Sequence, residues 1–491
     1  MSAKIFLGNA PWQNPGGYGV RAGSRWPHFE KNESDYMPFP FFLAYSSALL
    51  KENGFSVKLV DGIAEGINQN QFLDQLAAFS PDILVLEVST ISIQTDLEYA
   101  RLARSLLKNG SIIIFCGLHI EIKEPSFLEE HLDIDLVMFG EYEFTLLEIA
   151  RRWQKGKKLH DVLGTNYRDS QHKLFTNPAR PITADLNTLP WPDRDSLPMV
   201  KYCDTPGNIP KPSVQMWASR GCPFQCVFCA WPQIMYGGHR YRVRKPELVV
   251  DEMEWLVKER GFKSVYFDDD TFNIGKPRIM KICQEIKRRE INVPWAIMAR
   301  ADTMDTEMLH ALRAAGLCAL KYGIESADQS LVDRCGKGLD LTKVREIVSL
   351  TKKIGIFVHL TFTFGLPGET ADTIDKTINL ALELDPHSLQ FSIITPFPGS
   401  KLFDDLDARG HVLSKNWADY DGYSTAVIKT DFLEKEDLEA ALDRAYRSWE
   451  KHRFQKGMKQ EPWQVFRRAF KNPKQAMKRL IRVLIFMIRG K

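Results

Sequence analysis

Apolar runs and amphipathic stretches alternate along the first 153 residues of the chain. Five strand-like runs are expected, at residues 4–8, 56–61, 82–88, 111–117 and 135–140. Helix-like stretches such as 41–54 and 96–110 separate them, and each of these two ends in a glycine of the kind that terminates helices. Apolar strands joined by helical crossovers predict a parallel, doubly wound sheet, which binds ligands beyond the carboxyl ends of its strands.

The alternation resumes after a stretch rich in proline and aspartate. Residues 177–199 cannot sustain a helix or an inner strand, so we interpret 156–212 as a linker. Six further strand-like runs are expected, at residues 213–219, 264–270, 295–300, 320–326, 356–365 and 389–397. Helix-length stretches separate these runs. The sequence therefore predicts a partial (β/α)6 barrel over 213–400, with its chemistry at the carboxyl ends of the strands.

The length and composition of the chain predict how many domains it has and in which compartment it lies. The chain has 491 residues, which is too long for one core. Of these residues, 44% are hydrophobic and 26% are charged. We expect a first domain at 1–155, the linker, the barrel, and a C-terminal region at 401–491. The first residues lack the basic start and the apolar run of a signal peptide, so we expect a cytoplasmic protein. In that reducing compartment cysteines serve as ligands or catalysts more often than as disulfides.

Three of the eight cysteines are gathered in the segment ASRGCPFQCVFCAWP, residues 218–232. Cys222, Cys226 and Cys229 can hold zinc with a fourth ligand such as His239, or three irons of a 4Fe–4S cluster. Structural zinc sites commonly use two separate CxxC pairs, and this chain has no second pair, which favours the cluster. The other cysteines are expected to be small buried hydrophobes: Cys116, Cys203, Cys283, Cys318 and Cys335.

The segment RGCPFQCVFC resembles the cluster loop of radical S-adenosylmethionine (SAM) enzymes, whose pattern is CxxxCxφC with an aromatic φ. The resemblance implies that Cys222, Cys226 and Cys229 are the cluster ligands and that Phe228 neighbours the adenine of SAM. It also answers why there is no fourth cysteine. In this family SAM itself chelates the open iron through its amino and carboxylate groups.

The resemblance extends over roughly residues 213–400. YFDDDTF (266–272) implies that Asp269 or Asp270 accepts a hydrogen bond from the SAM ammonium, and YGIES (322–326) implies that Glu325 and Ser326 meet the ribose. Arg300 can pair with the SAM carboxylate. The structural alternatives are a helix cap for the aspartates, a surface acid for Glu325 and a structural ion pair for Arg300.

The first domain in front of such a barrel resembles the cobalamin-binding, or class B, radical SAM enzymes. Residues 112–153 carry this likeness, and it implies that Ser89, Thr90 and Gly117 line the pocket of the nucleotide tail. Many cobalamin domains carry Asp-x-His-x-x-Gly after the first strand, but GNAPWQNPGGYG (8–19) has no histidine. Cobalamin then binds without a protein histidine on cobalt, or the domain has lost it. His119 lies in another loop, and we interpret it as structural.

Together the two resemblances predict an α/β protein with an N-terminal flavodoxin-like, cobalamin-binding Rossmann domain, a partial (β/α)6 radical SAM barrel and a helical C-terminal region. They imply an enzyme with a 4Fe–4S cluster, SAM and cobalamin that methylates an unactivated carbon of a small or lipid-like, apolar or natural-product-type substrate. They also imply an external electron donor such as flavodoxin or ferredoxin. We name no catalytic acid or base, because the cofactors perform the difficult steps.

Two alternatives to methyl transfer stay open at this point. The first keeps the cofactors but closes a ring, oxidises or couples the substrate without transferring methyl. The second is a non-catalytic interaction protein that binds cobalamin or zinc.

The C-terminal tail is strongly basic. Residues 451–491 hold thirteen Lys and Arg against the single acid Glu461, whereas the whole chain carries only +3. A helix here would place Leu480, Val483, Leu484 and Met487 on one side with basic residues beside them. The apolar run is too short to span a bilayer, so we expect peripheral association with the inner face of the membrane. A helix docked on the barrel and RNA binding are the alternatives, and we expect no nucleic-acid partner.

Overall fold

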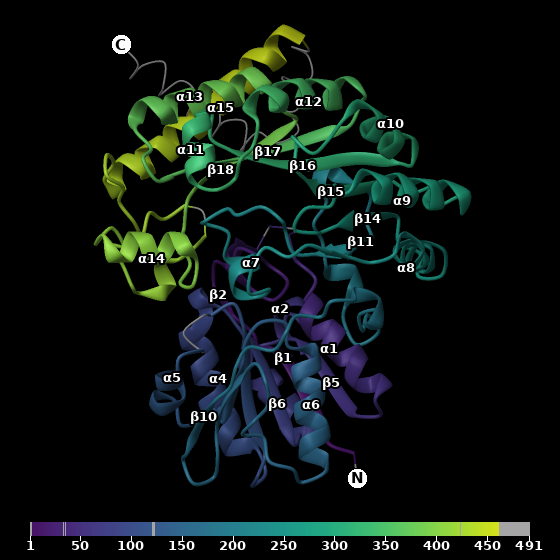
Figure 1. Cartoon of the computed structure of the whole chain (residues 1–491), viewed down its shortest axis with the longest axis vertical. Helices are drawn as coiled ribbons and strands as arrows, with labels where there is room; N and C mark the ends of the chain where they lie inside the picture. Colours follow the sequence, from purple (N-terminus) through teal and green to yellow (C-terminus); the bar gives the residue numbers. More distant parts are fainter. Residues whose placement is uncertain (1, 33, 35, 120–122, 423, 461–491) are drawn as a thin grey trace.

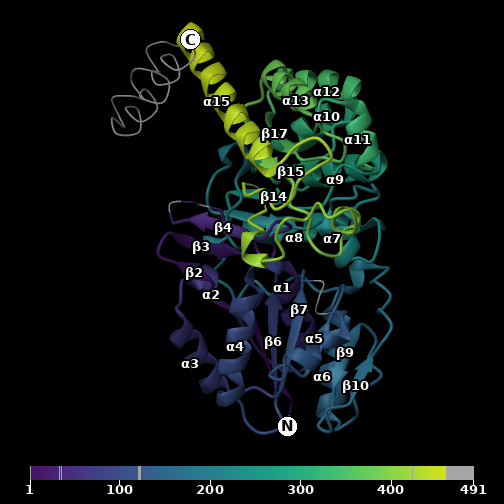
Figure 2. The same ribbon diagram turned by 90° about the vertical axis from the view of Figure 1, so that its left-hand side faces the viewer.

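The structure, a computed structural model, describes residues 2–32, 34, 36–119, 123–422 and 424–460. The first sheet lies at one end of the long axis, and a second, six-stranded sheet lies toward the other end (Figures 1 and 2). The predicted tail helix with Leu480, Val483, Leu484 and Met487 lies outside the described residues. No helix within them is both apolar enough and long enough to cross a bilayer.

Seven strands form the first sheet, in the order β10–β9–β8–β7–β6–β1–β5. They are β1 (Lys4–Asn9), β5 (Ser56–Asp61), β6 (Ile83–Val88), β7 (Ile112–Gly117), β8 (Leu136–Met138), β9 (Thr165–Arg168) and β10 (Leu174–Thr176). The five strands from β5 to β8 are parallel. Their order reverses direction between β1 and β6, so loops leaving these two strands flank the place where such a sheet binds ligands. The predicted flavodoxin-like arrangement is confirmed.

Helices cover both faces of the first sheet. On one face lie α1 (Phe41–Glu52) and α6 (Glu143–Gln154); on the other lie α3 (Gln69–Phe79), α4 (Ile93–Leu106) and α5 (Pro125–Glu130), while α2 (Gly62–Glu65) directly follows β5. Ile5 and Leu7 of β1 join the core under α1 and α6, and Phe6 between them joins the opposite core. Both faces are buried, which explains the nearly continuous apolar runs in the sequence.

Two features of this domain go beyond the predicted elements. Strands β9 and β10, from the range predicted as linker, extend the sheet in antiparallel fashion. After β1 the chain forms a small antiparallel sheet of β2 (Gln13–Asn14), β3 (Gly17–Val20) and β4 (His28–Lys31). Figure 2 shows this small sheet between the two parts of the molecule. The segment that lacks the cobalt-binding histidine motif therefore leads into a small sheet, and its Trp12 packs with Ile63 and Ile91 of the first domain.

The second sheet is parallel throughout and keeps sequence order from edge to edge. Its strands are β11 (Ser213–Met216), β14 (Ser264–Phe267), β15 (Trp295–Ala299), β16 (Leu317–Glu325), β17 (Phe357–Phe364) and β18 (Ser388–Ile393). No pairing joins β11 to β18, so the six strands form an open partial barrel, as predicted. A ribbon of β12 (Ser219–Arg220) and β13 (Arg242–Val243) follows β11.

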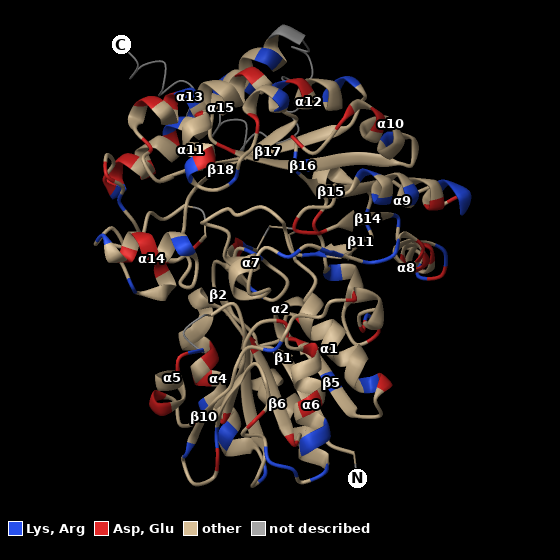
Figure 3. Ribbon diagram, viewed as in Figure 1, with Lys and Arg blue, Asp and Glu red and all other residues tan. Residues whose placement is uncertain are grey.

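The outer face of this sheet is covered by α8 (Pro246–Lys258), α9 (Lys276–Arg288), α10 (Thr306–Ala314), α11 (Gln329–Arg334), α12 (Leu341–Lys353) and α13 (Ala371–Leu384). The helix α7 (Ala230–Ile234) lies between β12 and β13, α14 (Lys401–Ala408) follows β18, and α15 (Lys435–Gln460) packs along β18 and α13. Leu320 and Leu360 belong to the core under the helices, whereas Lys321 and His359, the next residues along their strands, belong to the inner face. Both charge signs are spread along outer helices such as α8 and α9 (Figure 3).

Candidate functional site

The three clustered cysteines lie in the excursion between β12 and β13, beyond the carboxyl end of β11. Gly221 begins this excursion with φ of +85°, and a Cβ there would lie 1.9 Å from the carbonyl oxygen of Arg240. Only glycine fits such a position. Cys222, Cys226 and Cys229 follow, all half-buried and none in a disulfide. We call residues 221–229 the cysteine loop.

Gln233 of α7 holds the backbone of the cysteine loop. Its side-chain Nε2 lies 2.8 Å from the carbonyl oxygen of Cys229, 3.2 Å from that of Val227 and 3.5 Å from that of Cys226. The backbone N–H of Lys401 donates to Gln233 Oε1 at 2.9 Å. The Gln233 amide thus connects residues 226–229 of the cysteine loop to the segment after β18.

Burial raises the pKa of all three thiols, and the neighbouring cysteines and Asp270 raise that of Cys229 further. The positive charge of Arg25 opposes the rise at Cys229. Metal binding displaces such protons, so half-buried thiols on one loop suit a metal centre. Within the described residues, no three His, Cys, Asp or Glu side chains form a group that could hold one metal ion. Thiols spaced along one loop fit a 4Fe–4S cluster better, because each then binds a different iron.

The three aspartates after β14 are held by contacts with protein groups. Asp269 accepts from the backbone N–H of Ala218 at 2.9 Å and from the Ser219 hydroxyl, and burial raises its pKa to about 6. Asp270 accepts from the backbone N–H of Gly221 at 2.9 Å. Both predicted SAM-ammonium acceptors therefore brace the chain in front of Cys222.

An arginine from the first domain completes this arrangement. Arg25, between β3 and β4, reaches Asp270 Oδ1 through Nε at 3.0 Å and Asp268 Oδ1 through a terminal nitrogen at 2.9 Å. It also donates to the backbone oxygen of Asp268. The aspartate motif is thus a junction between the two domains.

Arg300, at the end of β15, lies against the cysteine loop. Its guanidinium carbon is 3.5 Å from the centre of the Phe224 ring, and Asp302 accepts two hydrogen bonds from it at 2.7 and 2.8 Å. Phe228, predicted to neighbour adenine, is 8% exposed and belongs to the main core of the second part. The aromatic ring stacked beside the site's cation is therefore Phe224.

Glu325 ends β16 in a strained conformation beside the cysteine loop. Its φ is +70°, unusual for a residue with a side chain, and the pairing of β16 with β17 shifts register there. Lys337 Nζ lies 2.9 Å from Glu325 Oε1, and the Thr363 hydroxyl donates to Glu325 Oε2 at 3.0 Å. Lys337 also lowers the pKa of Cys226 against the effect of burial. The predicted carboxylate thus lies in the same neighbourhood as a cysteine thiol.

Ser326 is fully buried, although it follows Glu325 directly. Its hydroxyl lies 3.3 Å from Thr377 Oγ1 of α13 and accepts from the backbone N–H of Asp328 at 3.1 Å. The structure places this predicted ribose contact in a turn against α13.

The predicted contacts of the first domain lie together at the carboxyl edge of its sheet. Ser89 and Thr90 are 1% exposed, and Gly117 has φ of +120° with its Cα packed against Val88. The Thr90 hydroxyl lies 3.4 Å from His119 Nδ1. The ring of Trp417, in η6 (Trp417–Asp419), lies 6.2 Å from that of His119, so the C-terminal region covers this edge.

The sequence did not single out four residues that shape this site: Arg25, Phe224, Gln233 and Lys337. Phe224 lies inside the cysteine run and Gln233 just after it, so their positions alone made them candidates. Arg25 contacts residues more than 240 positions away. No local pattern marks such a contact.

The comparisons with known proteins agree with this geometry. Residues 218–381 match the radical SAM superfamily, and residues 33–150 match the B12 binding domain. An uncharacterized methyltransferase, PH0819, of Pyrococcus horikoshii is 31% identical over 410 residues, covering 84% of this chain and 87% of that protein. The chain belongs to the B12-binding radical SAM enzymes. Its cofactors are therefore a 4Fe–4S cluster, SAM and cobalamin, as predicted.

Other members of this family differ in activity. An anaerobic magnesium-protoporphyrin IX monomethyl ester cyclase of Rubrivivax gelatinosus is 28% identical, covering 86% of this chain and 75% of the cyclase. The solved structure of the radical SAM methyltransferase TsrM from Kitasatospora setae, with cobalamin and a 4Fe–4S cluster bound, superposes with a TM-score of 0.64. It is 19% identical and covers 83% of this chain and 75% of that chain, which confirms the fold.

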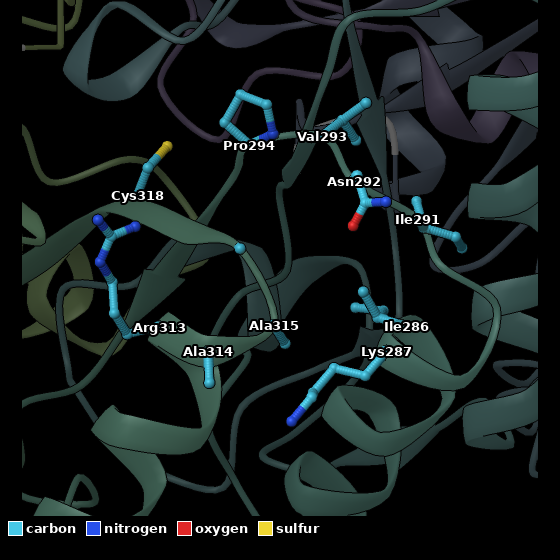
Figure 4. A pocket seen from close by; sticks show the side chains of 11 residues that line it. Ile286, Lys287, Ile291, Asn292, Val293, Pro294, Arg313, Ala314, Ala315 and Cys318 are labelled. Carbon is cyan, nitrogen blue, oxygen red and sulfur yellow. The ribbon is translucent and has the colours of Figure 1, made fainter.

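A pocket of about 370 Å³ lies away from this site (Figure 4). Lys287, Asn292, Arg313 and Cys318 are among the residues that line it, around the amino ends of β15 and β16. The amino-end face of a barrel contributes to stability, whereas the loops at the carboxyl ends carry the chemistry. This pocket therefore lies on the face that stabilises a barrel, and the cysteine loop remains the candidate site.

Proposed function

We propose that the chain is a cobalamin-dependent methyltransferase that methylates an unactivated carbon, with Cys222, Cys226 and Cys229 as cluster ligands. The observation that carries the proposal is the half-buried loop of three thiols, braced by Gln233 and Asp270, at the carboxyl edge of a parallel sheet. The Pyrococcus horikoshii relative, named a methyltransferase, supports the reaction type along most of its length.

The protein groups position the cofactors and exclude water from them. When bound, the cluster and cobalamin supply the electron that cleaves SAM and the methyl group that is transferred. Glu325, held by Lys337 and Thr363, keeps a carboxylate beside the loop, which complements the positive charge of SAM. Arg300, stacked on Phe224, provides a cation at the same edge for the SAM carboxylate. Ser89, Thr90 and Gly117 are proposed contacts of the cobalamin tail.

We propose that the substrate meets the inner face of the second sheet. Lys321 lies 2.8 Å from both carboxylate oxygens of Asp204, and its neighbour His359 lies 2.8 Å from the Ser388 hydroxyl. The Tyr266 hydroxyl is buried without a hydrogen-bond partner. The ion pair leaves little net charge here, so this face suits neutral hydrogen-bonding groups. We therefore propose a natural-product-type substrate with hydroxyl, carbonyl or amide groups rather than a purely apolar lipid.

An isotope experiment tests the reaction type. Anaerobic full-length protein, reconstituted with iron, sulfide and cobalamin, is incubated with methyl-¹³C SAM, a strong reductant and extract from a strain lacking the gene. We expect 5′-deoxyadenosine together with a product that gains one labelled methyl group. An unlabelled product that loses hydrogen would support the cyclase-type alternative. Absence of 5′-deoxyadenosine would overturn the proposal.

Two partners belong to the same proposal. The cluster needs an external one-electron donor, for which a flavodoxin or ferredoxin has suitable chemistry. The basic tail is proposed to bind anionic membrane surfaces. Deletion of residues 474–491 should abolish sedimentation with anionic liposomes and leave 5′-deoxyadenosine formation unchanged. Unchanged sedimentation would overturn the membrane role.

A further inference from the structure

The first domain grips the two residues in front of Cys222 from two sides. On one side, Arg220 forms ion pairs with Glu143 at 2.7 Å and Glu141 at 3.2 Å, both near the start of α6. On the other side, the backbone N–H of Gly221 donates to Asp270 Oδ2, and Arg25 holds Asp270 Oδ1. The start of the cysteine loop is therefore held directly by Glu141 and Glu143 of the first domain and, through Asp270, by Arg25.

Arg25 is connected to the cysteine loop through the largely buried side chain of Asp270. The side chains of Arg25, Asp268 and Asp270 are 16%, 10% and 7% exposed. Asp270 bonds to Gly221, which precedes Cys222, and Thr271, which follows Asp270, places its hydroxyl 3.4 Å from Cys222 Sγ. Charges so sheltered are screened less than surface charges, so their fields reach the loop.

The charge balance at this junction depends on Arg25. Asp268 and Asp270 bring two negative charges to the loop, and Arg25 neutralises one of them. A 4Fe–4S cluster becomes more negative by one charge when it takes up an electron. A nearby cation therefore stabilises the reduced cluster and a nearby carboxylate destabilises it, which are levers that set cluster potentials.

We propose that Arg25, supplied by the cobalamin-binding domain, raises the reduction potential of the cluster by offsetting Asp270 beside the cysteine loop. The seating of the first domain then controls how readily the cluster accepts an electron from its external one-electron donor. Arg25 acts through Asp270 and the loop, so it is a positioning residue. The inference rests on the proposed assignment of the three cysteines to the cluster.

Two substitutions with opposite expected effects test this inference. Arg25→Gln leaves Asp268 and Asp270 without their cation, so the midpoint potential should become more negative. Asp270→Asn keeps an oxygen for the Gly221 N–H but removes a negative charge, so the potential should become less negative. Arg101→Gln, on the outward part of α4, is the matched control and should not shift it. The measurement is an anaerobic redox titration of the reconstituted full chain, followed by electron paramagnetic resonance of the reduced cluster.

The outcomes separate this inference from the proposed function. Opposite shifts support it, because loosened packing alone would not reverse sign between the two variants. Equal potentials, or shifts in one direction, overturn it while leaving the cluster assignment intact. If Arg25→Gln does not fold, the sign of the Asp270→Asn shift decides. A wild-type chain with no reducible cluster would overturn the cysteine assignment and this inference together.

Discussion

The carboxyl edges of the two parallel sheets are built in opposite ways. In the first sheet the polar groups satisfy one another: Asn9 donates to Asp61 at 2.8 Å, the Tyr202 hydroxyl donates to Asp61 at 2.9 Å, and Arg21 pairs with Asp96. In the second sheet the surrounding side chains hold the backbone of the cysteine loop, while three thiols lie crowded on it. The polar groups named at the first edge are paired with one another, whereas the thiols at the second edge are the ligands that we propose for a metal cluster.

This difference predicts how each edge would accommodate its proposed cofactor. A network of paired polar groups is rigid, so the proposed cobalamin contacts Ser89 and Gly117 lie on a surface that is already formed. In the proposed cluster assignment the thiols of the cysteine loop lose their protons when iron binds, while Gln233 and Asp270 continue to hold its backbone. Arg25 then connects the first domain, whose edge is already paired, to the loop of the second sheet that we propose to bind the cluster.

The largest effect is expected from removing a thiol. Cys226→Ala should abolish the 4Fe–4S absorption and all 5′-deoxyadenosine formation, because no other side chain replaces an iron ligand on this loop. Iron content after anaerobic reconstitution and product chromatography measure it. Cys318→Ala, at the amino end of β16, is the control and should keep both. Equal loss in the two variants would show that the cysteine loop is not the metal site.

The contrast between the edges also explains what the sequence could predict. The alternating pattern predicted the parallel strands of both sheets, because buried parallel strands need continuous apolar residues, but it did not predict the antiparallel strands β9 and β10. The three cysteines are close together in the sequence, so their spacing alone revealed them. The sequence could not predict the ion pair of Arg25 with Asp268, because this contact depends on how the two domains pack. Asp269 and Ser326 matched family motifs, yet their hydrogen bonds are to protein groups, which no motif specifies.

The next largest effect concerns the buried ion pair at the loop. Lys337 and Glu325 side chains are each 10% exposed, so Lys337→Met leaves a buried carboxylate without its cation. We expect a loss of about 3–5 kcal/mol in the free energy of unfolding, measured by urea denaturation of the metal-free chain. The double variant Lys337→Met/Glu325→Gln should recover most of it. A double variant no more stable than the single one would contradict the importance of this pair.

Glu87, at the first edge, is a buried carboxyl group whose charge opposes folding. Burial raises the pKa of Glu87 to about 7, although the Tyr142 hydroxyl donates to it at 2.7 Å. Between the ordinary pKa of 4.5 and 7, the unfolded chain loses this proton while the folded chain keeps it, so stability falls as pH rises. Glu87→Gln should be more stable than wild type by up to about 3 kcal/mol at pH 8, and the difference should vanish near pH 4.

Thermal or urea unfolding across this pH range measures the Glu87 effect. Asp161→Asn, at a carboxylate whose side chain is 63% exposed, is the control and should show no comparable gain at pH 8. A difference between Glu87→Gln and wild type that does not change with pH would mean that Glu87 is charged in the folded chain. The first edge would then tolerate the charge of Glu87 without loss of stability.

The smallest effect is expected at the brace of the cysteine loop. Gln233→Ala removes the amide that contacts the carbonyl oxygens of Cys226, Val227 and Cys229, without touching a thiol. Because outer contacts of metal ligands typically matter tenfold or more, we expect about tenfold faster loss of iron to a chelator. Gln75→Ala, a half-buried glutamine of α3, should leave that rate unchanged. If both variants release iron at the wild-type rate, the cysteine loop keeps its conformation without the Gln233 contacts. The second edge would then not depend on this side chain to hold the loop.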